Sequence, residues 1–304
     1  MTLNVRIVKG STVFHVHGDQ AGAEGVYLAQ GQVQGLYDSP VKTTWKAGAF
    51  QTGATFRGRR FEHRDLVLGF HIMETLTSWE FNDSEFRRSF DFEVDPWDPD
   101  YEPTIVEVET ELSGVRKLDV LLHEAPDFDA PVDPIRQQHG NLILKLRAGE
   151  PFWYTDDIVS EFSGSGSSGS GVVTVSNPAD QIAYHKWVLS PGNWTLPDRE
   201  WSGPKGARSV VGSRNVSGIA ITTANGGAVV DLDRNELMFR DVNNTNLLAQ
   251  LSGKFFEYPI PPYTPAVELP VSYSGASGGA NVQVRIPQRW SRPWGMEMDL
   301  SGGS

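Results

Sequence analysis

The sequence predicts a mainly β protein built from two domains, and three observations support this. Short segments of alternating or β-branched residues recur along the chain and are closed by glycine, as in residues 5–10 and 12–18. Glycine (31 residues) and proline (19 residues) are plentiful, which fits many turns between short strands. The length of 304 residues is long for one domain and sufficient for two separate cores.

Residues 1–150 are predicted to form a β domain with one short helix. Segments 52–61 and 64–72 are expected to pair as antiparallel strands, and alternation places Leu66, Leu68 and Phe70 of the second segment on one apolar face. Segments 104–112 and 115–125 are expected to form a hairpin. The helix is predicted within residues 77–92, with capping residues at Asn82, Asp83 and Ser84 and with Phe86 and Phe90 at helical spacing.

Residues 151–304 are predicted to be almost purely β. At least nine short segments of strand-like residues follow one another there, separated by turn sequences such as TANGG and VNNTN. Regular spacing of this kind is typical of a β-sandwich or a jelly-roll-like domain. The domain boundary is expected near residue 150, where the aromatic, proline-marked sequence GEPFWYT begins.

The run of residues 163–171 contains only serine and glycine. Its spacing of Gly164, Gly166 and Gly169 formally matches the dinucleotide-binding fingerprint. That motif requires a helix immediately afterwards, whereas VVTV predicts a strand, so the nucleotide hypothesis is disfavoured. We predict a mobile loop between the first two strands of the second domain, and a linker between the domains is the alternative.

Charge is distributed unevenly along the chain. The net charge is −12, and nine acidic residues without one base fall between Asp91 and Glu111. An acidic field repels nucleic acid, which disfavours direct binding of DNA or RNA. The same field would suit a channel through which DNA passes without sticking, and a solvated acidic face is the plainer alternative.

No catalytic, cofactor-binding or metal site can be identified from the sequence. The chain has no cysteine, which excludes disulfides and thiolate ligands. It lacks a G-x-S-x-G elbow and a P-loop lysine motif, and no pair of carboxylates is singled out by its context. No signal peptide and no apolar run of about 18 residues is present, so no membrane insertion is expected. We therefore predict a protein that is not an enzyme.

Three tryptophans, Trp187, Trp194 and Trp201, fall within fifteen residues of the second domain. Exposed tryptophans on a β-sandwich stack on sugar faces, but tryptophans more often belong to a core or to a protein interface. These three are the candidate contacts for a partner protein or a glycan. A carbohydrate-binding module or lectin-like protein is accordingly the alternative function, and a glycan-cleaving enzyme with unidentified carboxylates is a third hypothesis.

The order of several motifs resembles a known family. The first half contains TTWKAGAFQTGATFRGRRFEHRDLVLGFHI, then SWEFNDSEFRRSF, then TELSGVRKLDVLLHEAP. This order is similar to the N-terminal domain of distal tail proteins of long-tailed bacteriophages, especially those of actinobacterial hosts. In the second half, VSNPADQIAYHKWVL and NWTLPD look like the start of the C-terminal galectin-like sandwich of that family. The resemblance covers nearly the whole chain, with a departure at PIPPYTP.

The resemblance implies a structural virion protein with neither catalysis nor a cofactor. Residues 1–150 would form a ring-forming β domain that docks on the tail tube, and residues 151–304 a galectin-like β-sandwich that faces a partner or a glycan. A ring, usually a homo-hexamer, would join the major tail tube protein to the tail-tip hub protein and to receptor-binding components. It would be assembled in the host cytoplasm and located at the tail tip of the virion.

In such a ring DNA would only pass through the lumen. The acidic run would contribute to the lumen or to its rim. The candidate lumen-facing residues are Asp91, Glu93, Asp95, Asp98, Asp100 and Glu102.

Overall fold

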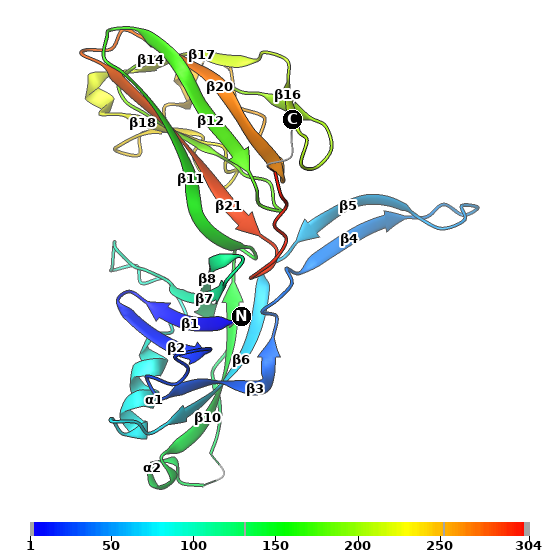
Figure 1. The fold of residues 1–304 in the computed structure, drawn as a ribbon, viewed down its shortest axis with the longest axis vertical. Coiled ribbons are helices and arrows are strands. Elements are labelled where there is room, and N and C mark those ends of the chain that lie inside the picture. Colours follow the sequence, from blue (N-terminus) through cyan, green and yellow to red (C-terminus); the bar gives the residue numbers. More distant parts are fainter. Residues whose placement is uncertain (1–2, 131, 252, 301–304) are drawn as a thin grey trace. The chain divides into compact units, whose positions relative to one another are not determined.

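A computed structural model of the chain describes residues 3–130, 132–251 and 253–300. Two compact units make up the fold (Figure 1): Met1–Tyr154 with Ser291–Gly295, and Thr155–Trp290 with Met296–Ser304. Strands predominate in both units, which confirms the mainly β fold class. The sequence division at residue 150 assigns Ser291–Gly295 to the second domain, whereas these residues pack with the first unit.

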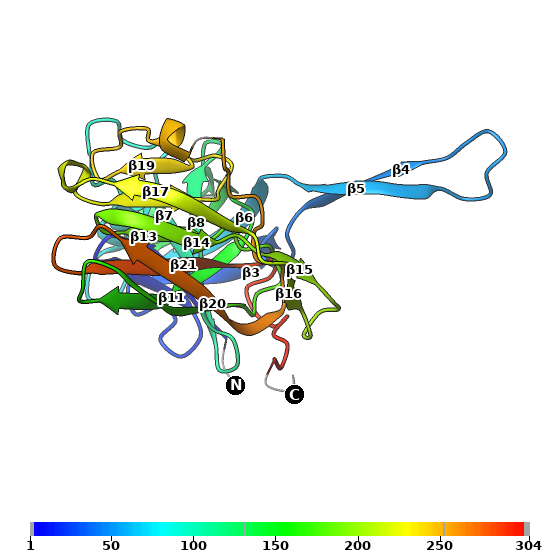
Figure 2. The ribbon, with the colours of Figure 1, turned by 90° about the horizontal axis from the view of Figure 1, so that it is seen from above.

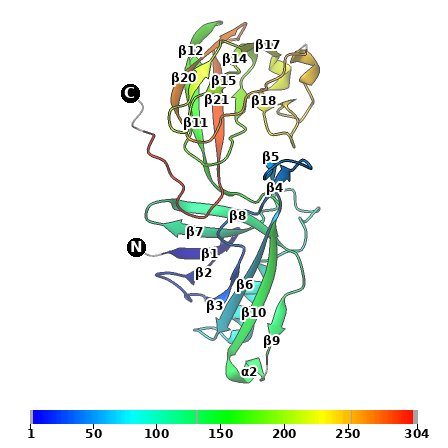
Figure 3. The ribbon, with the colours of Figure 1, turned by 90° about the vertical axis from the view of Figure 1, so that its right-hand side faces the viewer.

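The N-terminal unit is organised around two long antiparallel strands, β6 (Arg64–Met73) and β10 (His139–Ala148), which pair along their whole length (Figure 3). On its other edge β6 pairs with β3 (Val26–Gln34). The two ends of β10 pair with β9 (Asp127–Asp129) and with β8 (Gly114–Leu122). Alternation along β6 and β10 buries one apolar side chain in every two, as the sequence of β6 predicts.

A second ladder completes the unit. Strands β7 (Thr104–Thr110) and β8 form the predicted hairpin, which turns at residues 111–113. β7 also pairs with β1 (Asn4–Lys9), and β1 pairs with β2 (Thr12–His17). Most inward-facing side chains of these strands are valine, isoleucine, leucine or phenylalanine and form one side of the core, and Thr104 and Arg116 are buried among them.

Helix α1 (Trp79–Arg88) packs on this core through Phe86, whose ring lies edge-on to Phe14 and Phe70 at centroid distances of 5.0 and 4.8 Å. The helix begins earlier than predicted, because the hydroxyl of Ser78 accepts the backbone N–H of Phe81 and caps it. A second, four-residue helix, α2 (Pro134–Gln137), was not predicted. Its start is marked by an Asp-Pro pair, in which the Asp133 carboxylate accepts backbone N–H groups.

The pairing predicted for segments 52–61 and 64–72 is wrong. Strand β5 (Thr55–Phe61) pairs only with β4 (Val41–Lys46), and together they form a two-stranded hairpin that projects from the N-terminal unit (Figures 1 and 2). Strand β6 buries alternate apolar side chains, and its partners β10 and β3 also have apolar side chains that are buried on one face. The polar sequence of β5 offers no such face, so it cannot replace either strand.

The C-terminal unit is a sandwich of two antiparallel sheets. One sheet has the order β12-β20-β14-β17, and the other the order β19-β18-β13-β21-β11. The strands of the first sheet are β12 (Gly169–Asn177), β14 (Gly192–Pro197), β17 (Asn215–Ile221) and β20 (Thr264–Ser274). Those of the second are β11 (Trp153–Gly164), β13 (Lys186–Leu189), β18 (Ala228–Asp231), β19 (Phe239–Asp241) and β21 (Ala280–Trp290). Side chains from both sheets form a single buried cluster between them.

Smaller elements complete this unit. A two-stranded ribbon consists of β15 (Glu200–Ser202) and β16 (Ser209–Val211). Two 3-10 turns, η1 (Thr223–Asn225) and η2 (Leu248–Leu251), lie in the connections that follow β17 and β19.

The serine-glycine run joins β11 to β12, as predicted, but most of it lies in these strands and only four residues connect them. Its glycines are required by close packing. A Cβ on Gly164 would lie 2.2 Å from the Tyr273 hydroxyl oxygen, and one on Gly171 would lie 2.2 Å from the Phe162 ring. Tyr273 also donates a hydrogen bond of 3.0 Å to the Gly166 carbonyl. The predicted loop therefore spans only residues 165–168, and neighbouring aromatic rings occupy the space that side chains at Gly164 and Gly171 would fill.

Two buried arginines hold the returning C-terminal segment against the N-terminal unit. Arg64 donates to the Ser291 carbonyl at 3.0 Å and to the carbonyls of Leu36 and Pro151 at 2.9 and 2.8 Å. Arg116 donates to the carbonyls of Arg292 and Gly295 at 2.8 and 2.9 Å. Burial lowers the pKa of Arg64 to about 10, which leaves it charged at neutral pH.

Candidate functional site

The hairpin of Val41–Phe61, which we call the arm, exposes nearly every residue that it contains. Trp45 and Phe56 meet edge to face across the two strands, with ring centroids 5.4 Å apart, and both rings remain about half exposed. Phe50, in the turn at the far end, is fully exposed. An isolated two-stranded hairpin is at best marginally stable in water, and exposed aromatic rings add to that cost. The arm therefore has the properties of an element that is completed by another chain.

The arm is strongly basic. It contains five basic residues and no acidic residue. Lys42 and Arg60 both bind Glu62 at its base, at 2.7 and 2.5 Å. Hydrogen bonds from these two groups lower the pKa of the Glu62 carboxyl. Lys46, Arg57 and Arg59 have no carboxylate partner within the described part of the chain, so their charges face solvent.

The six carboxylates predicted to line a lumen lie in the connection between α1 and β7, and we call Asp91–Glu102 the acidic segment. One lysine fastens both of its ends, since Lys9 donates to the Asp91 carboxylate and to the Glu102 carbonyl, each at 2.6 Å. Burial opposes the charge of Lys9, but the hydrogen bond and the negative charge of Asp91 outweigh it, so the pKa of Lys9 is raised. Tyr101 also donates to Asp91, at 3.1 Å.

Between these fastened ends the segment is turned by its own side chains. Asp95 accepts the backbone N–H of Trp97 at 2.9 Å, and Asp98 accepts that of Asp100 at 3.0 Å. Apolar side chains stand outward among the carboxylates: Trp97 is 90% exposed, and Phe92 and Val94 are about 60% exposed. The six predicted residues lie within this one connection, which also exposes aromatic side chains that the sequence analysis did not consider.

Two of the three tryptophans proposed as contacts cannot act in that role. Trp187 and Trp194 are both 0% exposed and lie in the core between the two sheets of the sandwich. The indole of Trp194 donates to the Ser190 carbonyl at 2.9 Å and packs on Tyr273. The prediction is wrong for these two because inward positions of β13 and β14 take the largest apolar side chains. Trp201, on the ribbon of β15 and β16, packs against the same core and remains partly exposed.

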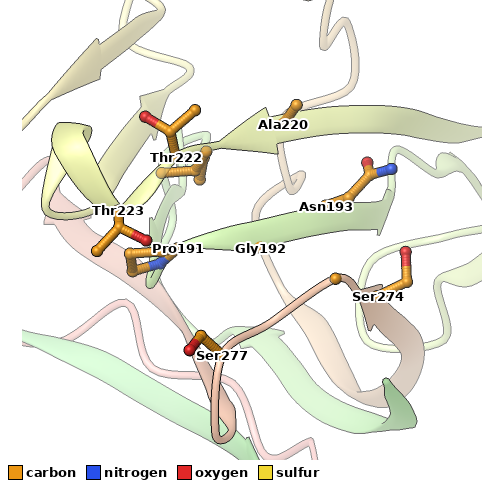
Figure 4. Close-up of a pocket in the computed structure, with 10 residues that line it drawn as sticks. Pro191, Gly192, Asn193, Ala220, Thr222, Thr223, Ser274 and Ser277 are labelled. Atoms are coloured by element: carbon orange, nitrogen blue, oxygen red, sulfur yellow. The ribbon is translucent and has the colours of Figure 1, made fainter. Parts of the chain in front are cut away.

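A cavity of about 340 Å³ opens at the sandwich between the ends of β14 and β17 and the connection from β20 to β21 (Figure 4). Its lining offers hydroxyl and amide groups, from Asn193, Thr222, Thr223, Ser274 and Ser277. It contains no carboxylate, imidazole or aromatic ring. Such a lining lacks both an acid-base pair and a platform for stacking a sugar.

A metal centre and a membrane-spanning helix are two further kinds of site to consider in the described residues. Among them, no group of three or more histidine, aspartate or glutamate residues is placed to hold a metal ion. Within residues 3–130, 132–251 and 253–300, no helix is long and apolar enough to cross a membrane.

The chain is similar to minor tail proteins along most of its length. It is 26% identical to minor tail protein Gp27 of Mycobacterium phage D29 over 91% of this chain and 94% of the relative. The same identity and coverage hold for minor tail protein Gp27 of Mycobacterium phage L5. No family model matches the sequence.

The fold is similar to that of a solved tail protein. The crystal structure of the SPP1 Dit protein, described as a paradigm of the hub adsorption apparatus in phages that infect Gram-positive hosts, aligns with a TM-score of 0.55. The alignment covers 94% of this chain and 98% of the Dit chain at 10% sequence identity. The chain is therefore similar to phage minor tail proteins in sequence and to a Dit protein in fold. The two phage relatives are named minor tail proteins, and nothing in the comparisons indicates enzymatic activity.

The sequence analysis missed the arm as a functional element. A signal for it exists in the sequence, because residues 41–61 combine five bases, no acid and four isolated large aromatic residues without a sustained apolar face. Such a segment cannot bury itself against the core of its own chain, which is the property that a projecting hairpin requires.

Proposed function

We propose that this Dit-like chain forms a homo-hexameric ring at the distal end of a long-tailed phage tail tube. In this role it joins the major tail tube protein on one side to the tail-tip hub protein on the other. The similarity to minor tail proteins and the Dit-like fold support the proposal. No catalytic step and no cofactor forms part of it.

The arm is the observation that carries the proposal. It pairs with no other strand of the described chain, and it exposes Trp45, Phe50 and Phe56 together with unpaired cations. A heterologous interface, in which one surface of a subunit binds a different surface of the next, closes into a ring when the rotation between copies permits it. An arm that extends away from its own core is suited to such a contact.

We further propose that residues 1–150 contain the ring-forming part and that the C-terminal sandwich, residues 151–304, is galectin-like and carries receptor-binding or other tail-tip components. Trp201 is the one predicted contact residue with exposed surface on that sandwich. In such a ring the six carboxylates of the acidic segment lie either at the lumen, through which DNA would pass, or at a contact between neighbouring subunits.

The experiment is a measurement of mass in solution, by native mass spectrometry or analytical ultracentrifugation, alone and with the tail tube protein. The wild-type chain is expected at the mass of six copies. A variant in which residues 44–58 are replaced by a short Gly-Asn turn is expected to remain monomeric with an unchanged circular dichroism spectrum. A wild-type chain that stays monomeric at all concentrations and with its tube partner, or an arm-deleted chain that still forms the ring, would contradict the proposal.

The alternative function, a carbohydrate-binding module, has lost its main support, because Trp187 and Trp194 are buried. Measuring the binding of the chain to a glycan array tests this alternative directly. Binding that is abolished by Trp201→Ala, while the variant keeps its thermal stability, would favour the lectin-like function over a purely structural one.

A further inference from the structure

The acidic segment has two properties that an aqueous channel wall does not require. Its apolar side chains Phe92, Val94 and Trp97 are exposed beside the carboxylates. In addition, Lys9 ties both of its ends to β1, and the Asp95 and Asp98 turns fix its course between them. Exposed aromatic residues held on a preorganised loop are typical of a surface that binds protein.

The arm has the complementary composition. The acidic segment contains six carboxylates and no base, and the arm contains five bases and no acid. Both elements also expose three large apolar side chains or more. The carboxylates of Glu93 and Asp100 form no ion pair and accept no hydrogen bond among the described residues. Their charges are therefore available to a second chain.

The placement of the two elements within the N-terminal unit fits contact between copies. In Figure 1 the arm extends from one side of this unit, and the connection between α1 and β7 that contains the acidic segment lies on the opposite side. The arm of one copy therefore points away from its own acidic segment. Two complementary surfaces on opposite sides of one unit are the arrangement from which a head-to-tail ring is built.

We infer that the acidic segment, Asp91–Glu102, is the docking surface for the arm of a neighbouring copy of this chain. This inference rests on the proposed ring. Arg57 and Arg59 face the carboxylates of the neighbour, and Trp45 and Phe56 pack with its Trp97 and Phe92. Charge complementarity guides the encounter and fixes the register, while removal of the aromatic rings from water supplies affinity. The acidic segment then lies at the boundary between two subunits. The alternative is that it faces the lumen of the ring.

Exchange of charges between the two surfaces is the first test. Arg57→Glu with Arg59→Glu on the arm, or Glu93→Lys with Asp100→Lys on the segment, is expected to weaken assembly at least tenfold. The chain that carries all four changes is expected to recover assembly. Glu74→Lys with Glu268→Lys is the matched control, because it makes the same change of charge at exposed positions outside the segment. Assembly of the wild-type chain is also expected to weaken as salt rises.

Cross-linking is the second test, and the absence of native cysteine makes it specific. Two preparations, one with Thr44→Cys on the arm and one with Asp100→Cys on the segment, are mixed and treated with a short bis-maleimide. A covalent dimer is expected. Thr44→Cys mixed with Phe81→Cys, an exposed position on α1, is the control that should not cross-link.

The outcomes separate this inference from the proposed ring. Suppose that rings form without the cross-link and without rescue by the fourfold charge exchange, and that the thiol of the Asp100→Cys variant reacts with a maleimide-polyethylene glycol reagent in the assembled ring. The segment would then lie in the lumen or on an outer surface. That result would overturn the inference and leave the ring intact. A chain that never assembles would overturn both.

Discussion

The arm and the core of the C-terminal sandwich both carry aromatic residues, and they use them in opposite ways. In the sandwich, Trp187 and Trp194 are completely enclosed between two sheets. In the arm, Trp45 and Phe56 contact each other on an exposed two-stranded ribbon. The number of layers around the strand decides the difference, because the sandwich strands have a second sheet opposite them and the arm strands do not.

This difference shows which aromatic residues signal a function. A cluster of tryptophans in alternating strands indicates a core, where each ring replaces water with close contacts. Large aromatic residues in a segment rich in basic residues and poor in other apolar side chains indicate a surface that another molecule covers. The comparison predicts large losses of stability for core substitutions and almost none for the arm.

The largest effect is expected for Trp194→Ala. The change removes a fully buried indole, leaves a cavity beside Tyr273 and leaves the Ser190 carbonyl without its donor. We expect a loss of about 3–5 kcal/mol in the free energy of unfolding of the C-terminal unit, measured by chemical denaturation. Trp201→Ala, at a partly exposed position, is the control and should cost clearly less. Equal losses of unfolding free energy in the two variants would contradict the distinction between the buried Trp194 and the partly exposed Trp201.

Acid is expected to destabilise the same core through His185. Burial lowers the pKa of His185 to about 4, and its ring lies edge-on to Trp187 at 5.7 Å. The unfolded chain has a pKa near 6.5, so it binds more protons below that pH. Stability is therefore complete above about pH 6.5 and falls as the pH drops towards 4, by about 3 kcal/mol at about 1.4 kcal/mol per unit of pKa difference.

This prediction is tested by measuring the free energy of unfolding at several pH values between about pH 4 and 6.5 and comparing the slopes. His185→Phe should flatten this slope, whereas substitution of the exposed His17 by glutamine should leave it unchanged. An equal slope in the His185 variant would show that other groups control the response to acid.

A smaller loss is expected in the N-terminal unit for Arg64→Met. The variant fills much of the buried space but leaves the carbonyls of Leu36, Pro151 and Ser291 without a donor. We expect a cost of about 2–3 kcal/mol, with faster hydrogen exchange around residues 291–295. Arg57→Met on the arm is the matched control and should change neither quantity.

The smallest effect on stability is expected in the arm. Trp45→Ser combined with Phe56→Ser should change the free energy of unfolding by less than about 0.5 kcal/mol, since both rings already face solvent. The same variant should lose assembly in the mass measurement. A large loss of stability would mean that the arm belongs to the core of its own chain, and the contrast with the sandwich would disappear.

Much of the fold could be predicted from local patterns. The alternation in β6, the hairpin of β7 and β8 and the helix that presents Phe86 are each encoded within about twenty residues, although the predicted helical position Phe90 lies just beyond the end of α1. The partner of β6 could not be predicted in this way, because β10 lies about seventy residues further along the chain. The candidate site was predicted only in part: the acidic segment was identified by its charge, whereas the arm was assigned to the wrong sheet.

By itself, the sequence determined the mainly β class, the strand-rich second half and the acidic segment, because strand periodicity and local charge depend on neighbours in the chain. Only the tertiary structure decided which aromatic residues are buried, since burial depends on which distant strands meet. The tertiary structure also decided that Ser291–Gly295 packs with the N-terminal unit, where Arg64 and Arg116 bind its backbone carbonyls. It also left the two strands of the arm without a further strand partner among the described residues.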